Sequence, residues 1–159
     1  MKVILATLND KEQIMALYRG MIGTPGCTWS KNYPNEDLFA MDVASSNLFC
    51  IKNQQNEVIA TVSVDQDKEV EELSVWTLPG KIAELARVAV RSDYQNQGIA
   101  RLLLTQTMAE LKTRNYQGAH FLVSETNPKA LASYKKLNFT LCGTSTLYGE
   151  HWLCYEKIL

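Results

Sequence analysis

The chain has 159 residues, a length typical of one domain of about 100–200 residues, so we expect a single domain over residues 1–159. Hydrophobic residues make up 46% of the sequence, which is enough for a buried core and excludes a mainly disordered chain. The 16 Lys and Arg residues nearly balance the 17 Asp and Glu residues, without any basic run. This charge pattern argues against nucleic acid or an anionic membrane as a partner.

No apolar segment reaches the length of about 18 residues that a membrane-spanning helix needs, and the apolar start at 2–8 is too short for a secretory signal. We therefore expect a cytoplasmic protein. The four cysteines form no C-x-x-C pair, which favours reduced thiols over a metal or redox site; they are Cys27, Cys50, Cys142 and Cys154.

The first half of the chain predicts short elements separated by clear turns. A strand at 3–5 is followed by Asn9 and Glu12, which predict a capping box at the start of a helix. Glycines and Pro25 end that helix in a loop at 23–34. The segments that follow are a short helix at 35–44, hairpin strands at 48–52 and 58–64, and an exposed acidic connection at 65–72.

The second half predicts strands that alternate with helices. The order is a strand at 82–90, a helix at 98–114, a strand at 119–124, a helix at 128–137, and strands at about 140–148 and 152–158. Strand, helix and strand in succession imply parallel pairing in the middle of the sheet, whereas the hairpins imply antiparallel flanks. We therefore predict an α/β fold with a mixed sheet and helices on both faces.

The segment that joins the strand at 82–90 to the next helix has the clearest functional signature. It reads Tyr94-Gln95-Asn96-Gln97-Gly98-Ile99-Ala100-Arg101. The start of a helix exposes unpaired N–H groups and the positive end of the helix dipole, and Gly98 lets a ligand approach the backbone. The segment alone is also compatible with a plain strand-to-helix turn that binds nothing.

These residues resemble the GCN5-related N-acetyltransferase (GNAT) superfamily, whose pyrophosphate loop has the pattern Gln/Arg-x-x-Gly-x-Gly/Ala. Gln95, Gly98 and Ala100 match that pattern. Upstream, 84–90 is similar to the central strand of the family, and downstream Asn127 and Tyr134 match its Asn-x-x-Ala-x-x-x-Tyr segment. Asn138 replaces the glycine that usually follows, and Asn tolerates the left-handed conformation needed there.

The resemblance implies the acyl-CoA N-acyltransferase fold, in which a mostly antiparallel sheet contains one splayed parallel pair. It also implies that acetyl-CoA is the acetyl donor, that no metal takes part, and that the pantetheine arm pairs with the central strand. Asn127 is equally well explained as a simple helix cap. The residues expected to hold acetyl-CoA are Val88, Ala89, Val90, Gln95, Asn96, Gln97, Gly98, Ile99, Ala100, Arg101, Asn127 and Tyr134.

Two side chains are candidates for catalysis. By the resemblance Tyr134 donates a proton to the leaving sulfur, although it is also compatible with a core aromatic residue. Glu84 interrupts an apolar strand and is the first candidate for the base, directly or through water. The alternative for Glu84 is a structural ion pair with Arg87 or a lysine.

Other polar residues leave alternatives open. His151 competes with Glu84 as the base, whereas His120 at the start of a strand is expected to be structural. Arg87 is expected to form a salt bridge with Glu84 or to hold a carboxylate of the acceptor.

The resulting functional hypothesis is acetyl transfer from acetyl-CoA to a primary amine by direct attack in a ternary complex. The acceptor is a small molecule or a protein N-terminus. The alternative is a non-catalytic acyl-CoA-binding sensor or regulatory module. Exposed edge strands near the C-terminus would permit a homodimer.

Overall fold

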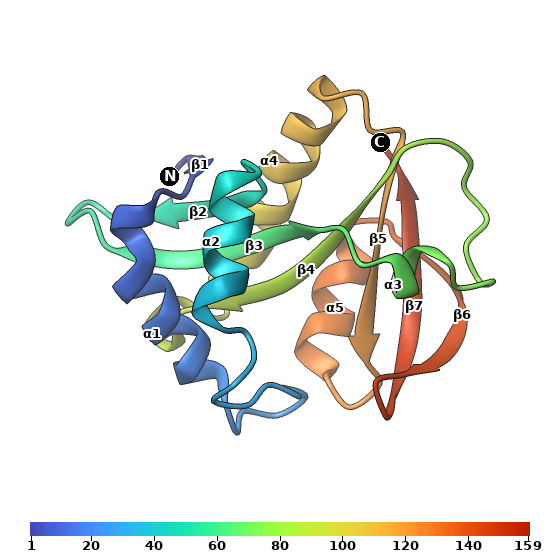
Figure 1. The fold of residues 1–159 in the computed structure, drawn as a ribbon, viewed down its shortest axis with the longest axis horizontal. Coiled ribbons are helices and arrows are strands. Elements are labelled where there is room, and N and C mark those ends of the chain that lie inside the picture. The colour runs from blue at the N-terminus through green and yellow to red at the C-terminus, as the bar shows by residue number, and fades with distance from the viewer.

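The computed structural model describes residues 1–159 and contains one seven-stranded sheet (Figure 1). Its strand order is β1-β2-β3-β4-β5-β7-β6. The strands are β1 (Val3–Leu5), β2 (Leu48–Lys52), β3 (Val58–Asp65), β4 (Ile82–Val90), β5 (Gly118–Ser124), β6 (Thr140–Leu147) and β7 (Glu150–Ile158).

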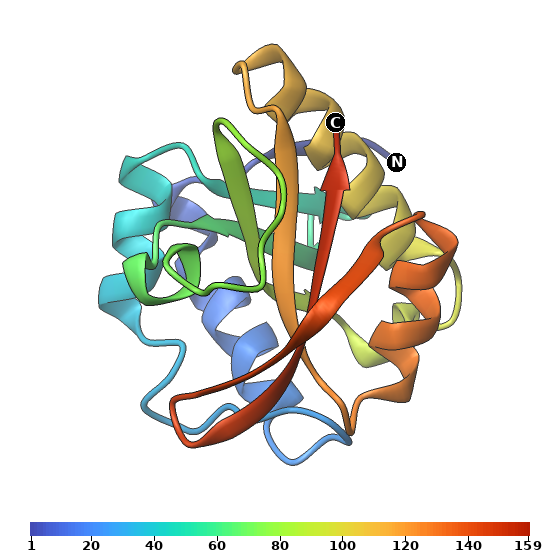
Figure 2. The same cartoon turned by 90° about the vertical axis from the view of Figure 1, so that its right-hand side faces the viewer.

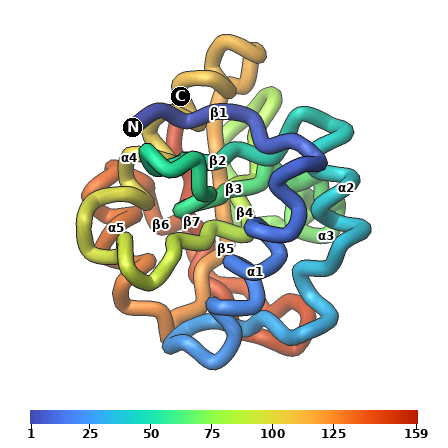
Figure 3. Tube along the Cα trace, turned by 90° about the vertical axis from the view of Figure 1, so that its left-hand side faces the viewer, coloured from blue at the N-terminus to red at the C-terminus, as the bar shows by residue number.

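Helices cover both faces of the sheet, as Figure 3 shows from the β1 side. One face carries α4 (Ile99–Thr113) and α5 (Pro128–Lys136). The other carries α1 (Lys11–Met21), α2 (Glu36–Ala44) and the single turn α3 (Lys68–Glu71). Two 3₁₀ turns complete the chain, η1 (Leu8–Asp10) and η2 (Ser92–Tyr94). None of these helices is both long and apolar enough to span a membrane.

The β4–β5 pair is the only parallel neighbour pair in the sheet. Its register covers Ile82–Glu84 against Gly118–His120 and then stops, although both strands continue. Beyond that point β4 turns away from β5, which leaves 85–90 and 121–124 without each other as partners (Figure 2). We call this unpaired stretch the β4–β5 divergence. The predicted mixed sheet with one splayed parallel pair is confirmed.

A β-bulge in β4 accompanies the divergence. In the β3–β4 ladder Thr61 lies opposite Ala89 and Ser63 opposite Ala86, so two residues of β4 face one residue of β3. Arg87 lies in this bulge and has a φ of 53°. A bulge bends its strand and shifts the alternation of side chains by one position. Arg87 and Ala89 therefore point to the same face as Glu84.

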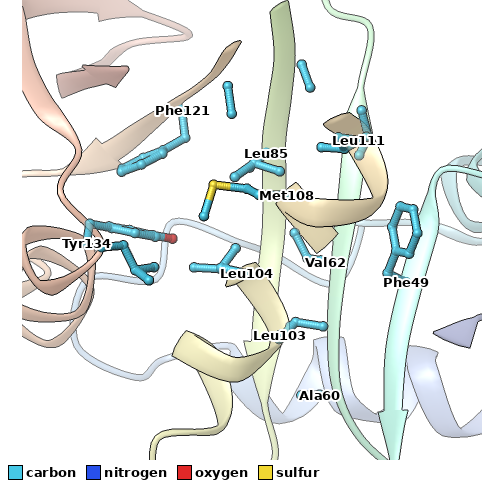
Figure 4. Close-up of a cluster of buried hydrophobic side chains, with 14 of the residues drawn as sticks. Phe49, Ala60, Val62, Leu85, Leu103, Leu104, Met108, Leu111, Phe121 and Tyr134 are labelled. Carbon is cyan, nitrogen blue, oxygen red and sulfur yellow. The ribbon is translucent and has the colours of Figure 1, made fainter. Parts of the chain in front are cut away.

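Two hydrophobic clusters hold the helices against the sheet. On the α4–α5 face Leu103, Leu104 and Met108 of α4 contact apolar side chains of the central strands (Figure 4). On the α1–α2 face Ile14 and Tyr18 belong to the second cluster. Removal of this apolar surface from water, at roughly 25 cal/mol per Å², is the main stabilising contribution.

The structure corrects several local predictions. The capping box is formed by Thr7 and Asp10, not by Asn9 and Glu12, because the 3₁₀ turn η1 directly precedes α1. The acidic connection at 65–72 contains α3. β7 begins at Glu150, so His151 lies within the strand and not in the turn.

Candidate active site

The segment between β4 and α4 presents a row of free backbone amides. The first helical hydrogen bond runs from the Leu102 amide to the Gly98 carbonyl, and no amide from Asn96 to Arg101 donates a hydrogen bond within the chain. Gly98, with a φ of 76°, precedes the first helical residue and turns these amides outward. Successive free N–H groups at the positive end of a helix form an anion-binding site.

Side chains of the same segment hold the loop in place. The Gln95 amide nitrogen donates to the Val90 carbonyl at 3.0 Å, and the Gln97 amide nitrogen donates to the Asp93 carbonyl at 3.0 Å. Both glutamines therefore shape the loop from within, and the groups left free are backbone amides. The predicted residues Gln95, Asn96, Gln97 and Gly98 are thus brought together at one end of the β4–β5 divergence.

Beyond the bulge, β4 offers backbone groups to the divergence. Val88 and Val90 pack on the α4–α5 cluster, whereas Ala89 is buried on the opposite face. β3 pairs with one edge of this part of β4, and the β5 side has no ladder partner. A peptide-like arm can add to such an open edge as an extra strand.

Asn127 caps α5, because its Oδ1 accepts a hydrogen bond from the Ala130 amide at 3.1 Å. Its position brings the α1–α2 loop close: a Cβ atom on Gly26 would lie 2.4 Å from the Asn127 Cβ. Gly26 has a φ of 79°. The absent side chain of Gly26 thus permits a contact between two loops that are remote in sequence.

Tyr134 lies on α5 and points into the α4–α5 cluster, with its hydroxyl directed toward Leu104 (Figure 4). Its ring centroid lies 3.9 Å from that of Phe121 of β5. Burial raises the pKa of the Tyr134 hydroxyl above its ordinary value, so the group keeps its proton at neutral pH. The core role and the proton-donor role of Tyr134 are compatible in this position.

Glu84 is buried at the closed end of the divergence, with only 7% of its surface exposed. Its Oε1 has no hydrogen-bond partner in the chain. Burial, reinforced by the charges of Asp65, Asp67 and Glu71, raises the pKa of Glu84 to about 8. A carboxyl group with a pKa near the working pH suits a general base.

Arg87 makes none of the predicted contacts with Glu84. Its guanidinium donates to both carboxylate oxygens of Asp42 at 2.9 and 3.1 Å, to Asp65 at 2.8 Å and to the Tyr33 hydroxyl at 3.3 Å. Burial opposes the charge of Arg87, but the two carboxylates raise its pKa and keep it ionised. Since these groups occupy its terminal nitrogens, Arg87 ties α2 and β3 to the bulge and is not placed to bind an acceptor carboxylate.

The two histidines occupy different environments. His120 is buried, and its ring stacks on Trp76 with the centroids 4.0 Å apart. His151 is exposed on β7, where its Nδ1 lies 3.1 Å from the Thr146 hydroxyl. No three His, Cys, Asp or Glu side chains come together as metal ligands.

Comparison with known proteins settles the family. The profile of the acetyltransferase (GNAT) family matches residues 13–139, which include the free amides, Glu84 and Tyr134. The chain belongs to the GNAT acetyltransferase family. The chain therefore belongs to a family that uses acetyl-CoA.

Solved structures share the fold of this GNAT acetyltransferase at low identity. A GNAT-family acetyltransferase from Streptococcus agalactiae has a TM-score of 0.83 at 20% identity, covering 99% of this chain and 95% of the other. Ribosomal-protein-alanine N-acetyltransferase from Brucella melitensis has 0.79 at 19%, covering 100% of both chains. A phosphinothricin acetyltransferase from Sinorhizobium meliloti, solved with acetyl-CoA, has 0.76 at 14%, covering 99% and 88%.

Sequence reasoning missed the acidic partners of Arg87. Asp42 lies on α2, and Asp65 ends β3, so neither is near Arg87 in sequence. The available signal was Asp42 within the apolar run 38–43, because a buried carboxylate requires a partner.

Proposed function

We propose that this GNAT acetyltransferase transfers the acetyl group of acetyl-CoA to a primary amine by direct attack in a ternary complex, with the whole chain acting as one domain. The observation that carries the proposal is the row of free amides from Asn96 to Arg101 at the end of the β4–β5 divergence. The pyrophosphate of the donor binds those amides, and its pantetheine arm pairs with the backbone of Val88, Ala89 and Val90.

The position of the donor assigns the two candidate catalytic groups to different steps. The amine nitrogen attacks the thioester carbonyl carbon, the C–S bond then breaks, and the nitrogen releases its extra proton to solvent, from which Tyr134 regains the proton it has given. A backbone N–H near Val88 stabilises the negative oxygen, and Tyr134 donates its proton to the sulfur. Asn127 borders the donor while capping α5.

The attacking amine must first lose a proton, which Glu84 accepts through water. Glu84 lies on the α1–α2 face, and Tyr134 lies on the α4–α5 face. Glu84 therefore acts on the acceptor amine from one side of the sheet, and Tyr134 acts on the leaving thiol from the other. The raised pKa of Glu84 is the supporting observation, because a carboxylate that ionises near 8 is a stronger base than an ordinary glutamate.

The second candidate is a non-catalytic sensor that binds acyl-CoA through the same amides. The buried Glu84, with one oxygen unpaired, favours the enzyme, since a mere sensor gains nothing from this costly placement. The acceptor is a small-molecule amine or a protein N-terminus. Pairing of two copies through the β6 edge of the sheet stays a prediction.

Release of the coenzyme A thiol, measured with a panel of small amines and peptides that have free N-termini, tests the proposal. We expect amine-dependent release that Glu84→Gln reduces. Binding of acetyl-CoA in calorimetry without release on any amine would support the sensor and contradict the enzyme. A matched control is Glu110→Gln, an exposed carboxylate on α4 paired with Arg114, which should leave release unchanged.

A further inference from the structure

A row of polar side chains crosses the middle of the sheet at one level. Asp65 of β3 lies opposite Glu84 of β4, Glu84 opposite His120 of β5, and His120 opposite Glu156 of β7. Residues in register on neighbouring strands project to the same face. Glu84 and His120 are therefore direct neighbours across the parallel pair, at the point where the β4–β5 divergence begins.

The flanking members of this row already have partners, but the central two do not. Asp65 accepts from Arg87, and Glu156 accepts from the Thr77 amide and hydroxyl and from the Leu78 amide. In contrast, Glu84 Oε1 and both ring nitrogens of His120 are buried without a hydrogen-bond partner in the chain. Only 3% of His120 is exposed.

Packing alone does not explain a histidine at this position. Trp76 stacks on the His120 ring, and its own indole N–H is directed to the Val70 carbonyl. An apolar ring would keep that stacking without burying two unsatisfied nitrogens, which cost stability. Neighbouring residues that both bear such a cost point to a shared function.

We propose that His120 is a positioning residue for Glu84, whose carboxyl group it engages through a hydrogen-bonded water between the two side chains. This inference rests on the proposed role of Glu84 as the base. The unpaired Glu84 oxygen and the unpaired ring nitrogens of His120, on residues in register, are the kind of polar partners that a buried water needs. The bridge fixes the carboxyl group and stabilises its ionised form.

The charge state of His120 agrees with this role. Burial lowers the pKa of His120 to about 4, although the charge of Glu156 opposes the shift. The ring is therefore neutral at pH 7, with one nitrogen that donates and one that accepts. It can donate toward the Glu84 carboxylate and accept from the protonated acid without taking up the proton itself.

The other charges around Glu84 act in both directions. Asp65 on β3, together with Asp67 and Glu71 of the α3 segment, disfavours the Glu84 carboxylate, whereas Arg87 on β4 favours it while its guanidinium donates to Asp42 and Asp65. On the far side of His120, Glu156 stays ionised because the hydrogen bonds from Thr77 outweigh its burial. Removing the nitrogens of His120 should therefore make Glu84 harder to ionise.

The test compares His120→Phe, which keeps a ring against Trp76, with His120→Gln, which keeps a polar group. For His120→Phe we expect the pH inflection of kcat/KM to move upward by about one pH unit, with about tenfold lower kcat/KM at pH 7. His120→Gln should return part of that shift. Thermal unfolding of His120→Phe checks that the variant is folded, because a ring against Trp76 is kept.

Two further measurements make the outcome decisive. In a Glu84→Gln background, His120→Phe should leave the pH profile unchanged. Carbon-13 NMR of the Glu84 carboxyl group in the folded protein should show the same upward shift of its titration, with or without an acceptor. An unmoved NMR titration in His120→Phe overturns the role of His120. If the titration moves but Glu84→Gln retains full activity, the role of Glu84 as the base fails instead.

Discussion

Substitution of Gly98 by valine tests the amide row most directly. Gly98 has a φ of 76°, and a Cβ built there would meet only the Arg101 Nη2, at 3.7 Å. The chain itself therefore leaves room for a side chain, and any loss of binding comes from a clash with the ligand or a displaced amide. A hydrogen bond from an amide to a charged group contributes about 1.5–3 kcal/mol.

Loss of one such bond predicts that the dissociation constant of acetyl-CoA rises at least about tenfold, which corresponds to ~1.4 kcal/mol. The left-handed backbone adds a separate cost of about 1–2 kcal/mol to folding, because an L-residue there brings its Cβ close to a carbonyl oxygen. For a chain of this size we expect a fall in melting temperature of roughly 2–8 °C. Titration calorimetry and thermal unfolding measure the two effects separately.

Gly149→Val is the matched control. Gly149 has a φ of 74° and no atom within 4 Å of a built Cβ, but it lies in the β6–β7 turn. It should reproduce the loss of stability and leave the dissociation constant unchanged. If Gly98→Val binds acetyl-CoA as tightly as the control does, the amide row is not the pyrophosphate site.

Three other substitutions probe the catalytic side chains and their support. Tyr134→Phe should lower kcat by about a hundredfold with little change in acetyl-CoA affinity, since proton donation matters only as the thiolate forms; full activity would leave Tyr134 a core residue. Glu84 ionises at about 8 when folded and near 4.5 when unfolded, so the wild type should lose stability as the pH rises through that window. Glu84→Gln should remove this loss. If the free energy of unfolding changes with pH in the same way for both proteins from pH 4 to 9, the pKa of Glu84 is not raised. Arg87→Met leaves Asp42 buried without its partner and should cost about 3–5 kcal/mol in chemical denaturation, whereas Lys11→Met removes an exposed ion pair and should cost under about 1 kcal/mol.

Most of the fold could be predicted from the sequence because its signals are local. The apolar run of β4 fixed its limits at Ile82 and Val90, and Asn138 adopts the left-handed φ expected of it. The capping box was wrong because Thr7 and Asn9 both precede a carboxylate at the right spacing, and only tertiary packing selects between them. The turn α3 was missed because four residues are too short to show a helical period.

The site was predictable where a motif is contiguous and not where its parts are distant. The segment 95–101 could be placed at a helix start because it follows the apolar strand at 82–90 and precedes residues with a helical period. The expected pairing of Arg87 with Glu84 was wrong although the bulge puts both residues on the same face, because Asp42 of α2 and Asp65 of β3 accept from the guanidinium instead. Neither the bulge nor these partners, which are distant in sequence, is visible in the spacing of residues 84 and 87.

The close approach of Gly26 to Asn127 has a consequence for the two halves of the sheet. It joins the half of the sheet that carries the α1–α2 loop to the half that begins with β5, on the side where β4 and β5 have parted (Figure 1). The two halves of the sheet are thus in contact at a second point, and β4 and β5 can move further apart only if the two loops separate. A methyl group on Gly26 would lie 2.4 Å from the Asn127 Cβ, so this single substitution would push the two loops apart.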